Sequence, residues 1–155
     1  MTRICVFSDS HGDVEKMKRA VLNERPDIVI HLGDCTADCD ELRREFSTMD
    51  IRNVRGNCDR FSAIPELLRT EVAGKRIFAA HGHRYDVKNS CNAICYAAME
   101  AEADILLFGH THIAYRDSHL GMEIMNPGST GRGISPSYGV VLIDGGVAST
   151  FIVRL

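Results

Sequence analysis

Histidine, aspartate and asparagine recur along this chain in short glycine-containing motifs. The motifs read SDSH at residues 8–11, GD at 33–34, GN at 56–57, HGH at 81–83 and GHTH at 109–112. Their carboxylate, imidazole and amide groups are oxygen and nitrogen ligands that suit divalent transition metals. The candidate ligands are Asp9, His11, Asp34, Asn57, His81, His110 and His112. One such histidine would more often be a structural hydrogen-bonding group, but a full set at five motifs indicates a metal site.

Seven ligands are more than one catalytic ion can use. A catalytic zinc keeps three protein ligands, and an octahedral ion surrounded by protein would have no position left for substrate. Two ions that share one bridging carboxylate would each have four protein ligands and open positions for water. The ligand count therefore favours a dinuclear site.

Each motif follows a short segment rich in Ile, Val and Phe, directly or, for GN, after Arg55, and such a segment predicts a strand buried on both faces. These segments are 3–7, 27–32, 51–54, 75–80 and 104–108. Helical patterns lie between them at 13–24, with Asp13 as the expected cap, at 37–48 and at 89–102. The alternation predicts an α/β fold. Because ligands bind at the carboxyl ends of the strands in open α/β sheets, the five motifs are expected to share one crevice.

The local geometry of the motifs is predicted from their spacing. Asp9 and His11, His81 and His83, and His110 and His112 are two residues apart, which in an extended chain turns both side chains of a pair to one side. Glycines are expected to let the backbone turn sharply beside the cluster, at positions 12, 33, 56, 82 and 109. Hairpins are expected at residues 73–75, at Gly121 and at 144–146, so antiparallel strands close the fold.

Composition limits the protein class. With 155 residues and 45% hydrophobic content, the chain is expected to form one domain over residues 1–155. Its net charge of -3 gives no general attraction to long nucleic acids or anionic membranes. It has no signal-peptide core or membrane-spanning stretch, so a soluble cytoplasmic protein with free thiols is expected. Assembly into a homo-oligomer is left open.

The ordered series D-x-H, G-D, G-N, H-G-H and G-H-x-H, with NPGS at 126–129, resembles the calcineurin-like metallophosphoesterases and their small YfcE-type phosphodiesterase branch. The resemblance implies two mixed β-sheets packed as a sandwich and flanked by helices in four layers. It implies that Asp34 bridges two ions. The first ion would also take Asp9, His11 and His112, and the second would take Asn57, His81 and His110. Manganese is favoured by the resemblance, with nickel, iron or zinc as alternatives.

The expected activity is hydrolysis of a small phosphodiester by a hydroxide that bridges the two ions. Members of the wider superfamily carry a G-N-H histidine and a G-D-x-x-D aspartate, and this chain has Cys58 and Ala37 there, with Asp38 displaced by one position. The absence of both tilts the hypothesis toward a diesterase. A phosphomonoesterase is the alternative within the enzyme class. A non-catalytic scaffold is the alternative outside it, since the fold also resembles that of a retromer coat subunit.

Several residues near the motifs have two candidate roles. His83 is either a general acid or phosphate donor, or a partner that orients a ligand. Asp59 is expected to orient a loop amide or a neighbouring side chain, and Cys58 is not expected to bind metal. Asn126 and Ser129 either contact the site or form a turn. One or two arginines are expected to bind substrate phosphate, among Arg55, Arg60, Arg84 and Arg132.

Overall fold

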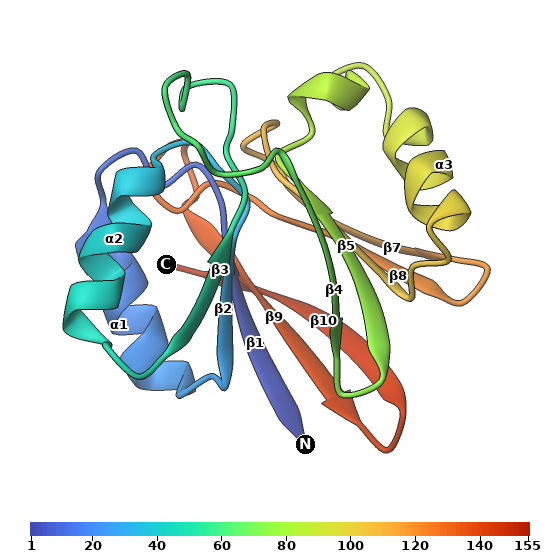
Figure 1. The fold of residues 1–155 in the computed structure, drawn as a ribbon, viewed down its shortest axis with the longest axis horizontal. Coiled ribbons are helices and arrows are strands. Elements are labelled where there is room, and N and C mark those ends of the chain that lie inside the picture. Colours follow the sequence, from blue (N-terminus) through green and yellow to red (C-terminus); the bar gives the residue numbers. More distant parts are fainter.

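A computed structural model describes residues 1–155 and shows two mixed five-stranded sheets packed face to face (Figure 1). The first sheet contains β1 (Thr2–Phe7), β2 (Ile28–His31), β3 (Asp50–Asn53), β9 (Ser137–Asp144) and β10 (Val147–Arg154), in the order β10-β9-β1-β2-β3. The second contains β4 (Leu67–Val72), β5 (Lys75–Ala80), β6 (Ile105–Phe108), β7 (Ala114–His119) and β8 (Met122–Pro127), in the order β4-β5-β6-β8-β7.

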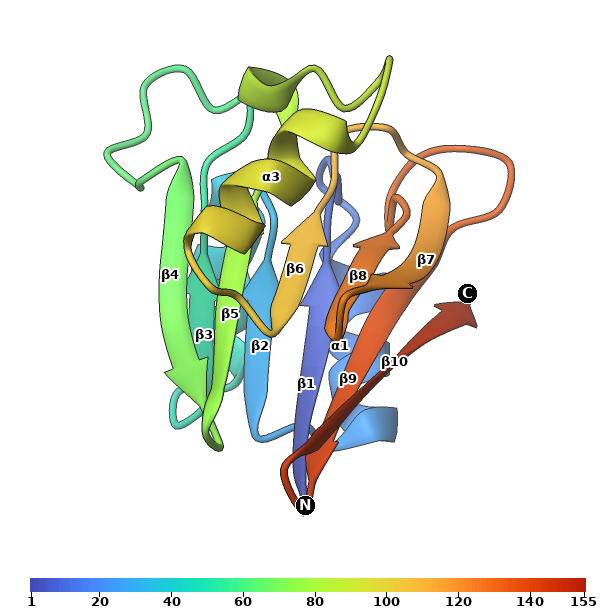
Figure 2. The ribbon, with the colours of Figure 1, turned by 90° about the vertical axis from the view of Figure 1, so that its right-hand side faces the viewer.

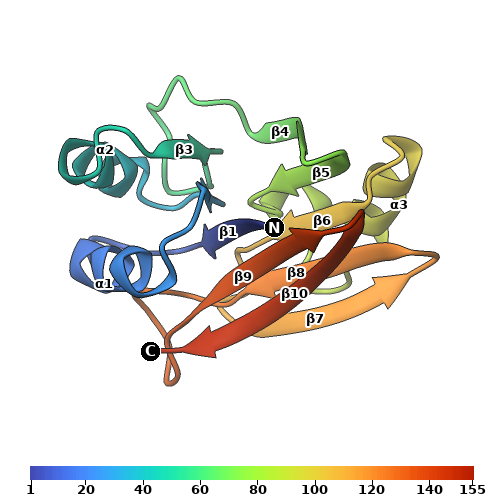
Figure 3. The ribbon, with the colours of Figure 1, turned by 90° about the horizontal axis from the view of Figure 1, so that it is seen from below.

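Helices cover the outer faces of both sheets. The helices α1 (Val14–Glu24) and α2 (Thr36–Glu45) lie on the first sheet, and α3 (Asn92–Glu100) lies across the second (Figures 2 and 3). A short 3₁₀ helix, η1 (His83–Tyr85), follows β5. The predicted four-layer sandwich is therefore confirmed. None of the helices has the length and apolar character needed to cross a membrane.

The strands β2 and β6 are buried at every position, and β1 and β5 are buried over their last four residues, because both faces of these strands are covered. In β1, Ile4 and Val6 point into the core between the two sheets, whereas Cys5 and Phe7 pack beneath α1 and α2. A third apolar cluster fills the space between α3 and the second sheet, and it includes Phe78 and Leu106. Burial on both sides explains why short continuous apolar runs mark these strands.

The strand directions bring the motifs together. In the first sheet β2 pairs in parallel with both β1 and β3, and in the second sheet β5 pairs in parallel with β6. Their carboxyl ends lie at the upper edge of the sandwich, where the loops that follow them meet (Figure 1; β6 is labelled in Figure 2). The predicted hairpins are also present, because β4 pairs with β5, β7 with β8 and β9 with β10 in antiparallel fashion.

The expected helix cap at Asp13 is present in position but not as a capping hydrogen bond. Asp13 occupies the N-cap position of α1, but its side chain makes no capping hydrogen bond. It forms an ion pair with Lys16 at 2.7 Å instead. The Asp38 carboxylate accepts a hydrogen bond from the Gly12 amide at 2.8 Å, so a residue of α2 helps to hold the start of this turn.

Candidate metal centre

All seven candidate ligands lie at the carboxyl ends of five strands, and their polar atoms meet between the two sheets. Asp9 and His11 follow β1, Asp34 follows β2, and Asn57 follows β3. From the second sheet, His81 directly follows β5, while His110 and His112 follow β6. The convergence predicted from the strand order is therefore present in the structure.

His81 lies at the centre of one half of the site. Its Nδ1 is 2.8 Å from the carbonyl oxygen of Leu32, so Nδ1–H donates to that oxygen and Nε2 faces the cluster. Around Nε2 lie Asn57 Oδ1 at 3.0 Å, His110 Nδ1 at 3.1 Å and Asp34 Oδ2 at 3.5 Å. Electron pairs of oxygen and nitrogen thus point toward one small region, which favours a cation there.

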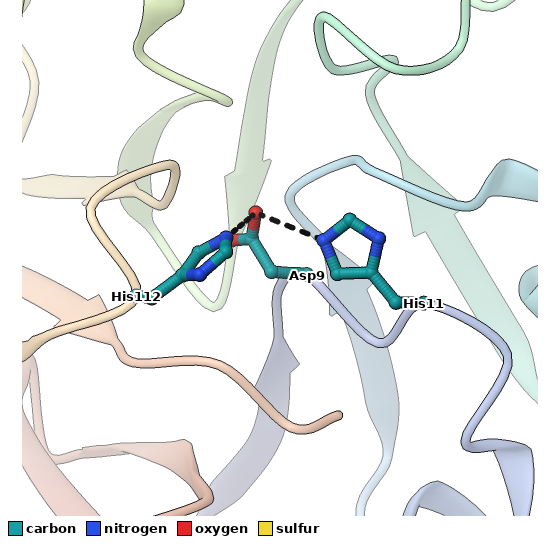
Figure 4. A group of neighbouring side chains, drawn as sticks. All are labelled: Asp9, His11 and His112. Carbon is teal, nitrogen blue, oxygen red and sulfur yellow. Dashed lines mark hydrogen bonds and ion pairs between the residues drawn. The ribbon is translucent and has the colours of Figure 1, made fainter. Parts of the chain in front are cut away.

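Asp9 lies at the centre of the other half (Figure 4). Its Oδ1 is 3.0 Å from His112 Nε2 and 3.9 Å from His11 Nε2. The Nε2 atom of His11 is buried and has no hydrogen-bond partner. A buried nitrogen without a partner is costly unless an ion or another group satisfies it. The Nε2 atom of His11 therefore has the position and the unshared electron pair that a metal ligand requires.

Asp34 lies between the two halves. Its Oδ2 is 3.5 Å from His81 Nε2 and 4.0 Å from His11 Nε2. Its other oxygen, Oδ1, accepts a hydrogen bond from the Cys58 amide at 2.9 Å. The carboxylate is thus held by one oxygen while the other faces histidines of both groups.

The electrostatics of the cluster also favour positive charge. Burial lowers the pKa of His81, but the hydrogen bond with Asp34 and the charge of Asp9 outweigh burial and raise it. Burial would raise the pKa of Asp34, but its contacts with His81 and the Cys58 amide hold that pKa below its ordinary range. Burial and the charge of His81 lower the pKa of His110 to about 4, so its ring is neutral near pH 7. The carboxylates of Asp9 and Asp34 therefore favour a positive charge beside His81.

The spacing fits divalent ions. Ligand atoms bound at about 2.1 Å and at right angles to each other are about 3 Å apart, and opposite ligands are about 4.2 Å apart. The distances within the cluster run from 3.0 Å for His112 and Asp9 to 4.0 Å for His11 and Asp34. The residues present therefore fit a metal centre made of nitrogen and oxygen ligands.

The backbone that carries the ligands differs from the expectation. Five of the seven have positive φ, with values of 52° at Asp9, 46° at His11, 59° at Asp34, 69° at His110 and 61° at His112. The expected extended geometry is thus wrong for the pairs 9 and 11 and 110 and 112, because left-handed turns direct these side chains inward. Each such residue costs about 1 kcal/mol or more, and strain of this kind clusters at functional sites.

The glycines beside the site act in two ways. Gly12, Gly33 and Gly82 have positive φ, in agreement with sharp turns. Gly56 and Gly109 do not have positive φ, and at these positions it is the absence of a side chain that matters. A Cβ atom at Gly56 would collide with the carboxylate of Asp34, and at Gly109 it would collide with the Ser8 side chain. These two glycines are needed for close approach of the loops.

Asp59 holds the two metal-facing loops of the first sheet together. One of its oxygens accepts hydrogen bonds from the amides of Asp34 and Gly56 at 2.9 and 2.8 Å. The other accepts from the amides of Cys35 and Thr36 at 2.9 and 3.0 Å, at the start of α2. The expectation that Asp59 orients loop amides is confirmed, and its carboxylate also caps a helix from a distant loop.

A second supporting network was not predicted. His31 is fully buried at the end of β2, where its Nδ1 accepts a hydrogen bond from the Gly33 amide at 3.1 Å. Its Nε2 is 2.8 Å from Ser10 Oγ, which donates to Asp38 at 2.6 Å. Burial lowers the pKa of His31 to about 4, so the ring is a neutral link between these loops. The available sequence signal was one polar residue ending an apolar strand just before the GD motif.

The NPGS segment supports the site from β8. Asn126 Nδ2 donates to the Gly109 carbonyl and to Thr111 Oγ1, both at 2.9 Å, and its Oδ1 accepts from the Gly128 amide at 3.0 Å. Ser129 Oγ donates to the carbonyl oxygen of Asp9 at 2.8 Å. Asn126 thus both forms its own turn and orders a ligand loop, so the two expected roles coexist.

His83 lies beside the cluster and makes no hydrogen bond to any of the seven candidate ligands. Its ring centre is 5.5 Å from that of His81 and 6.2 Å from that of His110. Its Nε2 is 3.6 Å from Glu66 Oε1, and its buried Nδ1 has no partner. Burial and the neighbouring His81 lower the pKa of His83. A role in orienting a ligand through a hydrogen bond is thus not supported by this geometry.

Only some of the four arginines face the site. Arg55 and Arg84 are engaged by Glu66 at 3.2 and 3.3 Å. Arg132 lines a hollow of about 370 Å³ together with His11, Cys58 and Ala37. Cys58 and Ala37, which replace the expected histidine and aspartate, therefore lie in one hollow beside a candidate ligand. Burial and Asp34 raise the pKa of the Cys58 thiol, which makes it a poor nucleophile.

Comparison with known proteins agrees with this geometry. The family description "calcineurin-like phosphoesterase superfamily domain" matches residues 2–146. The chain belongs to this superfamily. Calcineurin-like phosphoesterases are metal-dependent, so the family accounts for the nitrogen and oxygen ligands that meet at the strand ends.

The most informative relatives cover most of the chain. A probable metallophosphoesterase, YsnB of Bacillus subtilis, is 31% identical over 81% of this chain and 73% of its own. The phosphodiesterase YfcE of Escherichia coli K12 is 27% identical over 91% of this chain and 88% of its own. Vacuolar protein sorting-associated protein 29 of Schizosaccharomyces pombe is 27% identical over 91% of this chain and 81% of its own. The superfamily thus includes relatives with names from two functional classes.

The fold is shared with solved structures. A crystal structure of a predicted phosphoesterase from Streptococcus pneumoniae TIGR4 superposes with a TM-score of 0.76. It is 28% identical and covers 98% of both chains.

Proposed function

We propose that this calcineurin-like phosphoesterase is a phosphodiesterase that uses two divalent ions to hydrolyse a small phosphodiester. The observation that carries the proposal is the position of Asp34 Oδ2 between two groups of ligand atoms. One group contains His81 Nε2 at 3.5 Å, and the other contains His11 Nε2 at 4.0 Å. A carboxylate oxygen that faces both groups supports a bridging role.

The ligand sets follow from the two halves. Asp9, His11 and His112 with Asp34 would hold one ion, and Asn57, His81 and His110 with Asp34 would hold the other. When bound, such a pair acidifies water and neutralises charge on phosphoryl oxygens. The protein's own contribution is to fix these ligands through Leu32, the Cys58 amide and Asp59. The ligand set suits manganese, iron, nickel and zinc equally well. The preference for manganese therefore rests on the family resemblance alone.

The hollow beside His11 supports a diester substrate. A diester carries a second organic group on phosphorus, which needs room that a monoester does not. Cys58 and Ala37 are small, and they help to line a space of about 370 Å³. Arg132 lies on the same hollow and makes no ion pair, so its guanidinium is free to contact a phosphoryl oxygen.

We assign His83 as a hydrogen-bond donor to the substrate, oriented by Glu66. His83→Gln keeps a polar group, whereas His83→Ala removes it. If the donor assists the leaving group, His83→Ala should reduce kcat/KM for a poor leaving group at least tenfold more than for a good one, with partial recovery in His83→Gln. Equal losses with both leaving groups would reject this role.

The decisive experiment is hydrolysis by metal-stripped protein after single metals are restored. An activated aryl diester and the matching monoester are compared with Mn²⁺, Ni²⁺, Fe²⁺, Zn²⁺ and Mg²⁺ added one at a time. We expect turnover with at least one transition metal and a higher kcat/KM for the diester. Faster hydrolysis of the monoester would favour a phosphomonoesterase with the same centre.

A protein-binding scaffold is the second candidate. It is favoured by the similarity to vacuolar protein sorting-associated protein 29 over 91% of this chain. Retention of all seven ligand-type residues opposes it, because a scaffold needs no aligned set of this kind. The absence of turnover with every metal, in protein shown by elemental analysis to carry metal, would favour the scaffold.

A further inference from the structure

A second pocket has a volume of about 370 Å³ and shares no lining residue with the hollow that contains Arg132. Its apolar wall includes Val87, Phe108, Ile113 and Tyr115, and Lys88 is its charged residue. A volume of this size is within the range of small-molecule sites, which are mostly apolar with few polar groups.

The walls of this pocket continue the segments that carry the ligands. Thr111 lines the pocket and lies between His110 and His112 in the chain. On the other wall, Val87 packs over Gly82, since a Cβ atom on that glycine would lie 2.8 Å from a Val87 methyl carbon. Gly82 in turn separates His81 from His83. The pocket is therefore lined by, or packed on, the segments that carry His81 and His110.

The polar groups of the pocket are already paired. Thr111 Oγ1 accepts from Asn126 at 2.9 Å and from the Ile113 amide at 3.2 Å, and its hydrogen is directed at the Ile113 carbonyl. The Asn126 amide donates only to protein atoms, and Tyr115 donates its hydroxyl to Asp117 at 2.9 Å. Lys88 makes no ion pair. A ligand here would thus meet mainly apolar surface, the Cys91 thiol and the positive charge of Lys88.

Two of the apolar side chains remain open to solvent. Ile113 is 70% exposed and Tyr115 is 38% exposed, although Phe108 beneath them is buried. The rings of Phe108 and Tyr115 are 6.4 Å apart, in the range of aromatic contacts. These side chains offer a surface against which a flat ring can pack.

We propose that this pocket binds the aromatic ring of one ester group of the phosphodiester, as in a nucleotide, and selects the ring by shape and not by base identity. The proposal rests on the proposed function, because the phosphate of such a ligand would lie at the metal centre. Lys88 adds attraction for the phosphate charge. Because most of the wall is apolar and its free polar side chains are limited to Lys88 and Cys91, the bases would be distinguished only weakly.

The first test measures binding without catalysis. Metal-free protein with labelled isoleucine methyl groups is titrated by NMR with adenosine 5′-monophosphate, thymidine 5′-monophosphate and ribose 5-phosphate. We expect both nucleotides to shift Ile113, with affinities within threefold of each other, and ribose 5-phosphate to bind at least fivefold more weakly. Equal binding of all three probes would overturn the proposal, and a twentyfold preference for one base would overturn selection by shape.

The second test uses Ile113→Ser and a matched control. Leu120→Ser removes another exposed apolar side chain, 83% exposed, from the β7–β8 turn. In the metal-loaded enzyme Ile113→Ser should raise the KM for bis(4-nitrophenyl) phosphate about fivefold with little change in kcat, and Leu120→Ser should change neither. Identical KM values in all three proteins would overturn the proposal, as would an Ile113-dependent dimer seen by light scattering. If no ester is hydrolysed but nucleotides still shift Ile113, the proposed function fails and the pocket assignment stands.

Discussion

At the scale of single residues, Asp34 has the largest expected effect on metal content. Its Oδ2 faces both halves of the site, whereas Asn57 faces only His81, at 3.0 Å. Asp34→Asn should therefore weaken both ions, and Asn57→Ala should mainly loosen one. Elemental analysis after dialysis against limiting Mn²⁺ measures this difference. Equal metal content in the wild type and both variants would contradict the bridging assignment.

Cys58 carries a thiol beside the candidate metal site, but its contact with Asp34 is made by its backbone amide and not by the thiol. The Cys58 residue is exposed, but partial burial of its thiol and the nearby Asp34 carboxylate raise the pKa of that thiol. The backbone amide of Cys58 donates a hydrogen bond to Asp34 Oδ1 at 2.9 Å. Cys58→Ser keeps that amide, so metal content and diesterase activity should stay close to wild type. A loss of more than about tenfold in kcat/KM would make the thiol a participant in the reaction.

At the scale of elements, the loops depend on carboxylates that cap and connect them. Asp59 accepts four backbone hydrogen bonds, two of them from residues at the start of α2. A hydrogen bond to a charged group contributes about 1.5–3 kcal/mol, so Asp59→Ala should lower the free energy of unfolding by about 2–3 kcal/mol and weaken metal binding. Urea unfolding of the metal-free protein measures the first effect.

Asp13 gives the matched control for Asp59. It occupies the N-cap of α1 but makes no capping bond, and its ion pair with Lys16 is partly exposed. Exposed pairs contribute little, so Asp13→Ala should change the free energy of unfolding by no more than about 0.5 kcal/mol. Similar losses in the two variants would show that Asp59 has no special role at the loops.

At the scale of the whole molecule, the sequence predicts the strands and their ends well. Four of the five ligand-bearing strands contain short apolar runs that are buried on both faces, which gives them a clear sequence pattern, whereas β3 is buried only at Ile51. The helices are recovered as well, because their apolar faces repeat with helical period. The seven candidate ligands meet as expected, since parallel strands place their carboxyl ends at one edge.

The sequence predicts contacts between distant loops poorly. The link from His31 through Ser10 to Asp38 joins residues up to 28 positions apart, and no local pattern encodes it. The positive φ values at Asp9 and His110 are likewise set by the packing of the loops, because neither residue type requires them. The sequence predicts that Asp59 accepts hydrogen bonds from loop amides, but it does not predict which amides these are. Pattern thus gives the positions of the ligands, and tertiary structure gives their orientation.

Metal removal should therefore affect the stability of the whole molecule. The ligands come from strands of both sheets, so bound ions would connect the two halves of the sandwich, and a ligand at a thousand times its Kd stabilises a fold by about 4 kcal/mol. Differential scanning calorimetry with Mn²⁺ should show a Tm several degrees above that of the chelated protein. Asp34→Asn should lose most of this shift. An equal shift in Asp34→Asn would show that the stabilising ions bind away from the strand ends, and the absence of any shift in the wild type with all five metals would contradict a metal centre between the sheets.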